Sequence, residues 1–166
     1  MQEFIGRLHP LLVHLPIGIL LLAILLEWLP AHKPYKSVRR SIRFILWIGF
    51  FSAVASGITG YLLSQSGEYE SEAVSWHQNA GIALIIFSFV YAWVRGQKQL
   101  RPIFKLLSIV ALGLLTVTGH LGGTLTHGEG YLTSGFDSVK EVDLSNVNLQ
   151  KAIYYDDLVK PILESR

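Results

Sequence analysis

The chain has 166 residues, of which 51% are hydrophobic and 16% are charged, and its formal net charge at pH 7 is +2. This composition excludes an ordinary soluble domain. The absence of cysteine excludes disulfides, thiolate metal sites and covalent haem attachment within the chain, and the single methionine disfavours a thioether copper site. The basic residues lie in short segments between apolar runs, which is not the pattern of a nucleic-acid-binding protein.

Four apolar runs follow one another along the chain, each about twenty residues long, the length of helix that crosses a bilayer. The first run has no basic segment before it and no small-residue cleavage site after it, so we expect a retained helix rather than a signal peptide. Pro10 suits the first turn of this helix, and Pro16 is expected to bend it. The second run contains small residues over 56–60 that favour close helix contact. The predicted spans are approximately residues 10–29, 44–63, 76–94 and 103–126.

The charges are segregated by segment. Residues 31–43 carry five Lys or Arg and no acid, residues 95–105 carry four and no acid, and residues 64–75 carry three glutamates and no base. Under the positive-inside rule both basic segments are cytoplasmic. We therefore expect a multi-pass membrane protein with its N- and C-termini on the outer side of the membrane. The basic side chains are expected to be solvated, and Glu27 to lie at the cytoplasmic end.

The character of the chain changes near residue 128. Residues 128–148 are polar and rich in turn formers, and residues 149–166 have the pattern of a short amphipathic helix that is too polar to span a bilayer. The fold class we predict is an all-α membrane protein. A four-transmembrane-helix bundle (residues 1–128) is followed by an extracytoplasmic tail (residues 129–166).

Five of the six histidines fall at or just under the predicted outer face, and only His32 falls in a cytoplasmic loop. His120 and His127 are seven residues apart, close to two helical turns, so both leave one face about 10 Å apart along the axis. Ionisable residues inside membrane spans indicate function by default. The five are His9 and His14 at the start of the first span, His77 at the start of the third, and His120 and His127 at the end of the fourth.

Depth suggests how these histidines pair. His14 and His120 are expected to be buried at similar depth, roughly 6–10 Å inside their span ends at 1.5 Å per residue, so they are the favoured axial pair for a haem iron. The alternative pair is His77 with His127, nearer the surface. Each histidine could instead be an ordinary interfacial or hydrogen-bonded side chain. Three glycines beside the last two histidines are expected to admit a porphyrin edge: Gly119, Gly122 and Gly123.

The fourth span also carries four threonines. A threonine inside a helix commonly bonds back to a carbonyl of its own helix, and it can otherwise orient a ligand imidazole through its second nitrogen. We expect the first of these arrangements for all four, Thr116, Thr118, Thr124 and Thr126.

Two stretches resemble known families. The opening Leu8-His-Pro-Leu-Leu-Val-His-Leu-Pro-Ile-Gly18 and the closing Gly119-His-Leu-Gly-Gly…His127-Gly128 are similar to a bacterial four-helix membrane domain of unknown function. The resemblance covers about residues 8–128 and implies haem binding, with His9, His14, His77, His120 and His127 as candidate ligands. It also implies the bacterial inner (cytoplasmic) membrane, so that the N- and C-termini are expected on the periplasmic side. Residues 155–166 resemble the segment before the haem-attachment site of planctomycete-type cytochrome c domains, which are often fused to membrane modules of this type. This resemblance implies that the tail (residues 129–166) is the start of a cytochrome c domain, with a c-type haem directly outside the membrane.

Three functions follow as hypotheses. The first is a membrane electron-transfer module with one b-type haem, exchanging electrons with an extracytoplasmic cytochrome c domain and taking them from quinol as a candidate reductant. The second is a site for Zn²⁺, Cu²⁺ or Fe²⁺ built by three or four of His14, His77, His120 and His127 without porphyrin. The third is a structural membrane anchor. No catalytic triad, paired carboxylates or phosphate loop stands out, so an electron-transfer subunit is expected rather than an independent enzyme.

Overall fold

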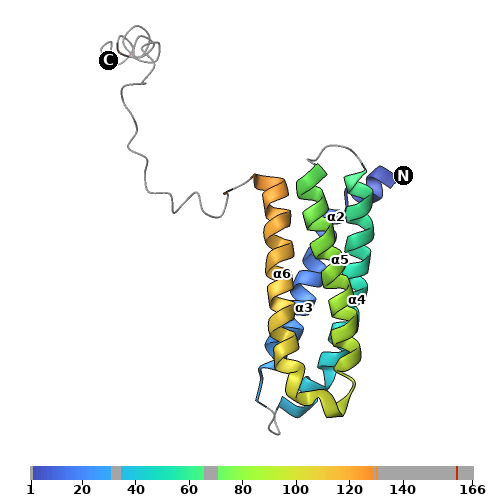
Figure 1. Ribbon diagram of the computed structural model, residues 1–166, viewed down its shortest axis with the longest axis vertical. Coiled ribbons are helices and arrows are strands. Elements are labelled where there is room, and N and C mark those ends of the chain that lie inside the picture. Colours follow the sequence, from blue (N-terminus) through green and yellow to red (C-terminus); the bar gives the residue numbers. More distant parts are fainter. Residues whose placement is uncertain (1, 31–34, 66–70, 129, 131–159, 161–166) are drawn as a thin grey trace. The chain divides into compact units, whose positions relative to one another are not determined.

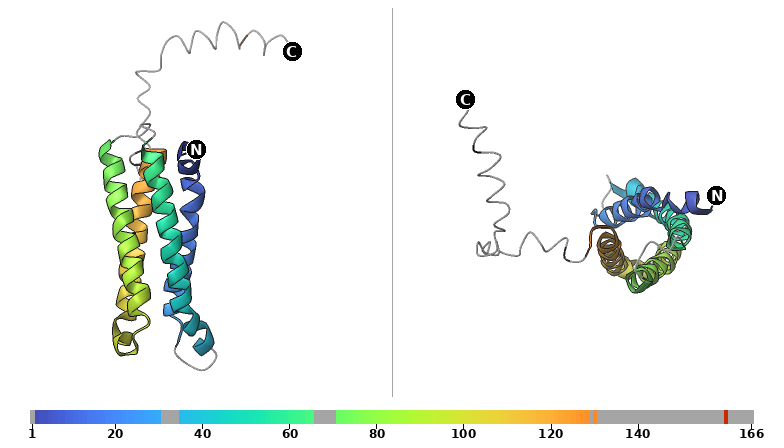
Figure 2. Two further views of the ribbon diagram at one scale, coloured as in Figure 1. Left: turned by 90° about the vertical axis from the view of Figure 1, so that its right-hand side faces the viewer. Right: turned by 90° about the horizontal axis from the view of Figure 1, so that it is seen from above.

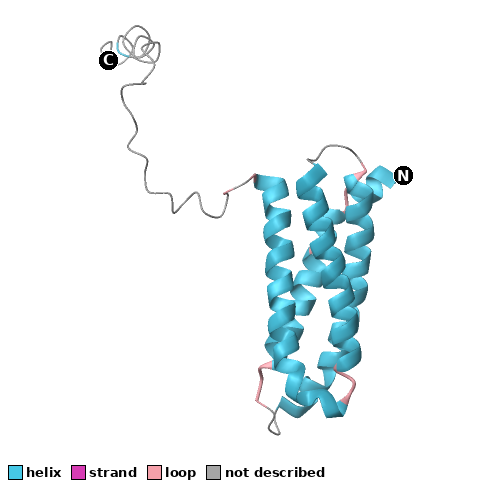
Figure 3. Cartoon of the chain, viewed as in Figure 1, coloured by secondary structure: helices cyan, strands magenta, loops and turns pink. Residues whose placement is uncertain are grey.

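The computed structural model describes residues 2–30, 35–65, 71–128, 130 and 160. Within these residues the regular structure is helical (Figures 1 and 3). The elements are α1 (Gln2–Gly6), α2 (His9–Leu12), α3 (His14–Glu27), α4 (Lys36–Ser64), α5 (Ser71–Val94), the 3₁₀ helix η2 (Lys98–Ile103) and α6 (Phe104–His127).

Four helical segments are long and apolar enough to cross a membrane: Gln2–Glu27, Ser37–Ser64, Glu72–Val94 and Gln99–His127. Successive long helices run in opposite directions, and seen from above they form a ring (Figure 2). Helix α4 packs between α3 and α5, and α6 packs against both α5 and α3, which closes the ring. The predicted all-α, four-helix membrane fold is confirmed. The bundle belongs to a compact unit, Met1–Glu129, and the predicted tail helix lies outside the described residues except for Lys160.

Two helices begin earlier than the sequence predicted. Helix α4 starts at Lys36 rather than near residue 44, and α5 starts at Ser71 rather than at residue 76. The charges of residues 31–43 suggested a loop, but Lys and Arg are good helix formers whose long stems let the charge reach water from a helix end. The basic segment is therefore largely an extension of the second span.

The first span is built from three short helices. Helices α2 and α3 are separated at Val13, three residues before Pro16, whose ring lacks an N–H and conflicts with the carbonyl of Leu12. The N-terminal lead forms α1, in which Gly6 is buried against α4. A Cβ added to Gly6 would lie 2.8 Å from the Leu63 backbone nitrogen, so this crossing requires glycine.

The small residues of α4 allow close helix contact, as predicted. A Cβ on Gly57 would lie 2.8 Å from the Ile85 side chain of α5, and a Cβ on Gly60 would lie 2.7 Å from the His9 ring. Ser56 and Thr59 on the same face are buried. Below them the apolar core runs along the axis of the ring, and it includes Leu20, Ala23, Ile24, Ile42, Leu46, Leu84, Tyr91, Ala92, Ala111 and Leu115.

Candidate histidine site

The structure brings His9 and His77 together inside the ring. Their ring centroids are 6.3 Å apart, and the ring planes are inclined at 73°. His9 comes from α2 and His77 from α5, helices on different sides of the bundle, and both side chains are half-buried. Both imidazoles therefore lie at the end of the bundle where α4 and α6 end, which we call the histidine end.

Helix α4 holds the His9 ring in place. The Nδ1 atom of His9 lies 2.9 Å from the Ser56 carbonyl oxygen, and the ring fits against Gly60. A carbonyl oxygen only accepts hydrogen bonds, so Nδ1 carries the proton and donates it. This tautomer leaves the Nε2 lone pair of His9 free. Thr59 lies beside the ring, and its hydroxyl donates to the Ser56 carbonyl at 2.9 Å.

The His77 ring packs against α6 and lacks a hydrogen-bond partner at one nitrogen. A Cβ on Gly122 would lie 3.0 Å from its Cε1 atom and 3.5 Å from its Nδ1 atom. Within the described residues, His77 Nδ1 is buried and has no partner, and the same is true of the Thr118 hydroxyl oxygen. One buried polar atom of α5 and one of α6 are thus unsatisfied, a costly arrangement.

The other three candidate histidines are exposed on the bundle surface. The expected depth of His14 and His120 in the membrane stays a prediction, but depth along a span does not say which face of the helix a residue takes, and both side chains are exposed. The buried positions of α6 are Phe104, Ser108, Ala111 and Leu115. His120 is five residues beyond Leu115, which turns it about 140° away from that buried face at 3.6 residues per turn. His127 is also exposed, and its Nδ1 atom lies 2.7 Å from the Thr126 hydroxyl.

The three glycines differ in their surroundings. Gly122 lies against the His77 ring, whereas a Cβ on Gly119 or Gly123 would have no atom within 4 Å apart from the residues adjoining it. Gly122 therefore makes room for an imidazole from α5. Gly119 and Gly123 leave open space on the outside of α6.

The described residues contain no group of three or more His, Cys, Asp or Glu side chains arranged to hold a metal ion. Two histidines meet, His9 from α2 and His77 from α5. A pair leaves a bare metal ion short of the three or four protein ligands that zinc takes.

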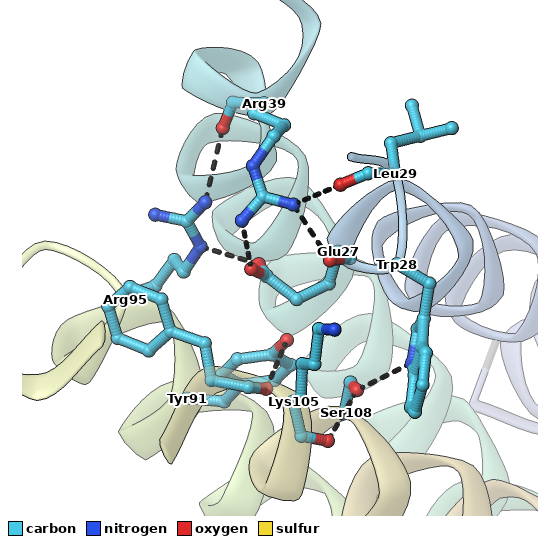
Figure 4. Close-up of polar contacts among 9 residues, drawn as sticks. Glu27, Trp28, Leu29, Arg39, Tyr91, Arg95, Lys105 and Ser108 are labelled. Carbon is cyan, nitrogen blue, oxygen red and sulfur yellow. Dashed lines mark hydrogen bonds and ion pairs between the residues drawn. The ribbon is translucent and has the colours of Figure 1, made fainter. Parts of the chain in front are cut away.

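The opposite end of the bundle, which we call the basic end, holds a buried charge cluster (Figure 4). The Glu27 side chain is 1% exposed, and its two oxygens accept hydrogen bonds from Arg39 Nη2 at 3.0 Å and from Arg95 Nε at 2.7 Å. Arg39 also donates to the Glu27 and Leu29 carbonyls, and Arg95 donates to the Arg39 carbonyl at 3.2 Å. One carboxylate thus joins α3, the start of α4 and the residue after α5.

The expectation that the basic segments are simply solvated is wrong for Arg39 and Arg95. The sequence held a signal that we missed: Glu27 is the only acid between Arg7 and Glu68, so its carboxylate needed a basic partner. Next to the cluster, Trp28 Nε1 donates to the Ser108 hydroxyl at 3.1 Å, which ties α3 to α6. The Arg95 guanidinium lies 4.5 Å from the centre of the Phe104 ring.

Comparison with known proteins places the chain in a family. No curated protein and no solved structure matches it. The family model described as "Predicted membrane protein (DUF2231)" matches residues 7–134, which include most of the first span, the other three spans and both histidine-containing motifs. The chain therefore belongs to this family of membrane proteins of unknown function.

Proposed function

We propose that the chain is a membrane electron-transfer module that binds one b-type haem through His9 and His77. The observation that carries the proposal is the 6.3 Å separation of the two ring centroids. Two imidazoles bound through nitrogen on opposite sides of one metal atom, each at about 2.0–2.1 Å, have ring centres roughly 6 Å apart. The spacing of this pair therefore suits axial ligation of a single iron.

The tautomer of His9 supports a ligand role. Histidines that bind metals usually donate the second ring N–H to a backbone carbonyl or a carboxylate, which fixes the orientation of the ring. His9 has this arrangement, because its Nδ1 lies 2.9 Å from the Ser56 carbonyl and its Nε2 is left to bind. Gly60 lets the ring lie close enough to α4 to make that bond.

A site that offers two histidine ligands suits haem better than a bare metal ion. A porphyrin brings four nitrogen ligands of its own, so the protein needs to supply two axial ligands, whereas a structural zinc site takes four protein ligands. A bound haem would supply a one-electron carrier within the bundle. The residues of this chain would fix its position and exclude water through the packed helix ends.

The surroundings suggest which partners the module serves. The two basic segments, residues 31–43 and 95–105, adjoin the ends of the spans away from the histidine pair, so the positive-inside rule supports a histidine end that faces the periplasm of a bacterial cell. An extracytoplasmic cytochrome c domain, which the resemblance of residues 155–166 suggests, would then exchange electrons on the same side. Quinol in the bilayer is a candidate source of those electrons.

Optical spectra test the proposal. The chain is expressed in haem-replete cells, purified in detergent, and compared with His9→Ala, His77→Ala and the double variant His14→Ala/His120→Ala. We expect the unmodified protein to show a Soret band and the reduced bands of a six-coordinate haem. We expect either single variant to lose six-coordinate binding, because each removes one axial ligand.

The double variant is the matched control, since its histidines are exposed and lie outside the pair. It should keep the unmodified spectrum. The proposal is overturned by an unmodified protein that contains no haem, or by single variants that bind haem as the unmodified protein does. Elemental analysis of the same samples detects the alternative, a stoichiometric transition metal without porphyrin.

A further inference from the structure

One threonine of α6 differs from the other three. The hydroxyl groups of Thr116, Thr124 and Thr126 donate to carbonyls of their own helix, at 2.9 Å to Leu112, 3.0 Å to His120 and 3.1 Å to Gly123. These three bonds agree with the expectation for threonines inside a helix. Thr118 departs from it, because its hydroxyl oxygen is buried and has no partner in the described part of the chain.

Thr118 lies on the side of α6 that contacts the His77 ring, and the Nδ1 atom of that ring also lacks a hydrogen-bond partner among the described residues. Thr118 precedes Gly122 by four residues, so both face the same side of α6, and Gly122 is the residue against which the His77 ring packs. The Thr118 carbonyl also lies close enough to the ring to interact with its N–H, so it competes with the hydroxyl as an acceptor. The Thr118 hydroxyl and the His77 Nδ1 atom, which both lack a partner in the described part of the chain, therefore lie on the two sides of the contact between α5 and α6 at Gly122.

We propose that Thr118 is the positioning residue for His77, with its hydroxyl oxygen accepting a hydrogen bond from the Nδ1–H group of the ring. A threonine hydroxyl has two acceptor lone pairs and one donor, so it can accept from the imidazole. A rotation of the side chain, or one bridging water molecule, brings the two atoms into a hydrogen bond. Burial supplies the driving force, because two buried polar atoms without partners cost more than a pair that is joined.

The bond would give His77 the same tautomer as His9. With the proton on Nδ1, the Nε2 lone pair of each ring is free to bind. Helix α4 would then orient the His9 ring, and helix α6 would orient the His77 ring. The role of Thr118 in haem binding rests on the proposed function, but the tautomer that it imposes on His77 does not. The two ideas can therefore fail separately.

The test compares Thr118→Val, which removes the hydroxyl at nearly constant shape, with Thr118→Ser, which keeps it. Thr116→Val is the matched control, because Thr116 lies on the same helix and donates to the Leu112 carbonyl. The full chain is labelled with ¹⁵N-histidine and studied without haem by nuclear magnetic resonance, with the His77 signals assigned from their loss in His77→Ala. We expect Nδ1–H to dominate in the unmodified protein, Thr118→Ser and Thr116→Val, and to lose population in Thr118→Val.

A second readout uses haem titration of the same variants. Removal of a partner that orients a ligand typically weakens binding about tenfold or more, so we expect Thr118→Val to raise the haem dissociation constant by about tenfold and the other two to leave it unchanged. The inference is overturned if Thr118→Val has the tautomer population of Thr116→Val. If no variant binds haem, the proposed function fails, while the tautomer measurement still decides the role of Thr118.

Discussion

Replacing Glu27 with glutamine is expected to lower the free energy of unfolding by about 3 kcal/mol, the lower end of the range for breaking a buried ion pair. The carboxylate is 1% exposed and faces two guanidinium groups, Arg39 and Arg95, whose side chains are 22% and 14% exposed. Without the negative charge these two cations face each other without compensation. Because both retain some contact with solvent, we expect the lower end of that range. Denaturation of the detergent-purified chain measures the effect.

An exposed pair provides the control for this prediction. Glu3 and Arg7 form an ion pair of 2.6 Å on α1, with side chains 65% and 68% exposed. Exposed pairs of this i,i+4 type contribute about 0.3–0.5 kcal/mol, so Glu3→Gln should change stability by no more than that. Equal losses for Glu27→Gln and Glu3→Gln would show that the buried cluster does not hold the basic end of the bundle together.

Replacing Gly60 with alanine is expected to displace the His9 ring and to destabilise the bundle by about 1–3 kcal/mol, the usual cost of overpacking. The new methyl group would lie 2.7 Å from His9 Cε1 and 3.0 Å from its Nδ1. The ring must move away from α4, and its bond to the Ser56 carbonyl is then lost. Haem binding should weaken along with stability, which a titration and a denaturation curve measure together.

Gly123→Ala is the matched control for the glycine substitution. A Cβ at Gly123 meets no atom within 4 Å outside its own chain neighbours, so alanine should stabilise α6 by about 0.5–1 kcal/mol through its higher helix propensity. Opposite signs for the two glycines are the expected result. Haem binding that depends on Gly123 and not on Gly60 would instead favour the outer face of α6 as the place where a porphyrin edge enters.

The four spans could be predicted because their signal is length. A run of about twenty apolar residues has few alternatives to a membrane-crossing helix, and the structure has four such helices. Helix ends were harder to predict, as α4 shows. Its first turns are charged, so a rule that marks a span by its apolar residues alone starts this helix too late.

The histidine pair could not be predicted from the sequence, because in a membrane both faces of a helix are apolar. Buried positions of α6 include Ser108 and Ala111, whereas Leu106 and Ile109 on the same helix are 59% and 52% exposed. The usual contrast between an apolar inner face and a polar outer face is therefore missing. The sequence predicted that five histidines gather at one end of the bundle, but not that His9 and His77 are the two that turn inward.

The partner of Glu27 could be predicted in kind but not in identity. A lone acid beside two acid-free basic segments indicates an ion pair, since an unpaired buried carboxylate is costly. Which of the basic residues bind it depends on how the ring of helices closes. Residues 39 and 95 are far apart in sequence, and the packing of α4 against both α3 and α5 brings them to the Glu27 carboxylate.

Electron paramagnetic resonance of the ferric, haem-loaded chain tests the central proposal most directly. The planes of the His9 and His77 rings are inclined at 73°, and axial imidazoles that are nearly perpendicular leave two of the iron d orbitals almost equal in energy. We therefore predict a low-spin, strongly anisotropic signal that is lost in His9→Ala and in His77→Ala and kept in His14→Ala/His120→Ala. A high-spin signal in the unmodified protein, or a low-spin signal that survives His9→Ala and disappears from the double variant, would contradict the account.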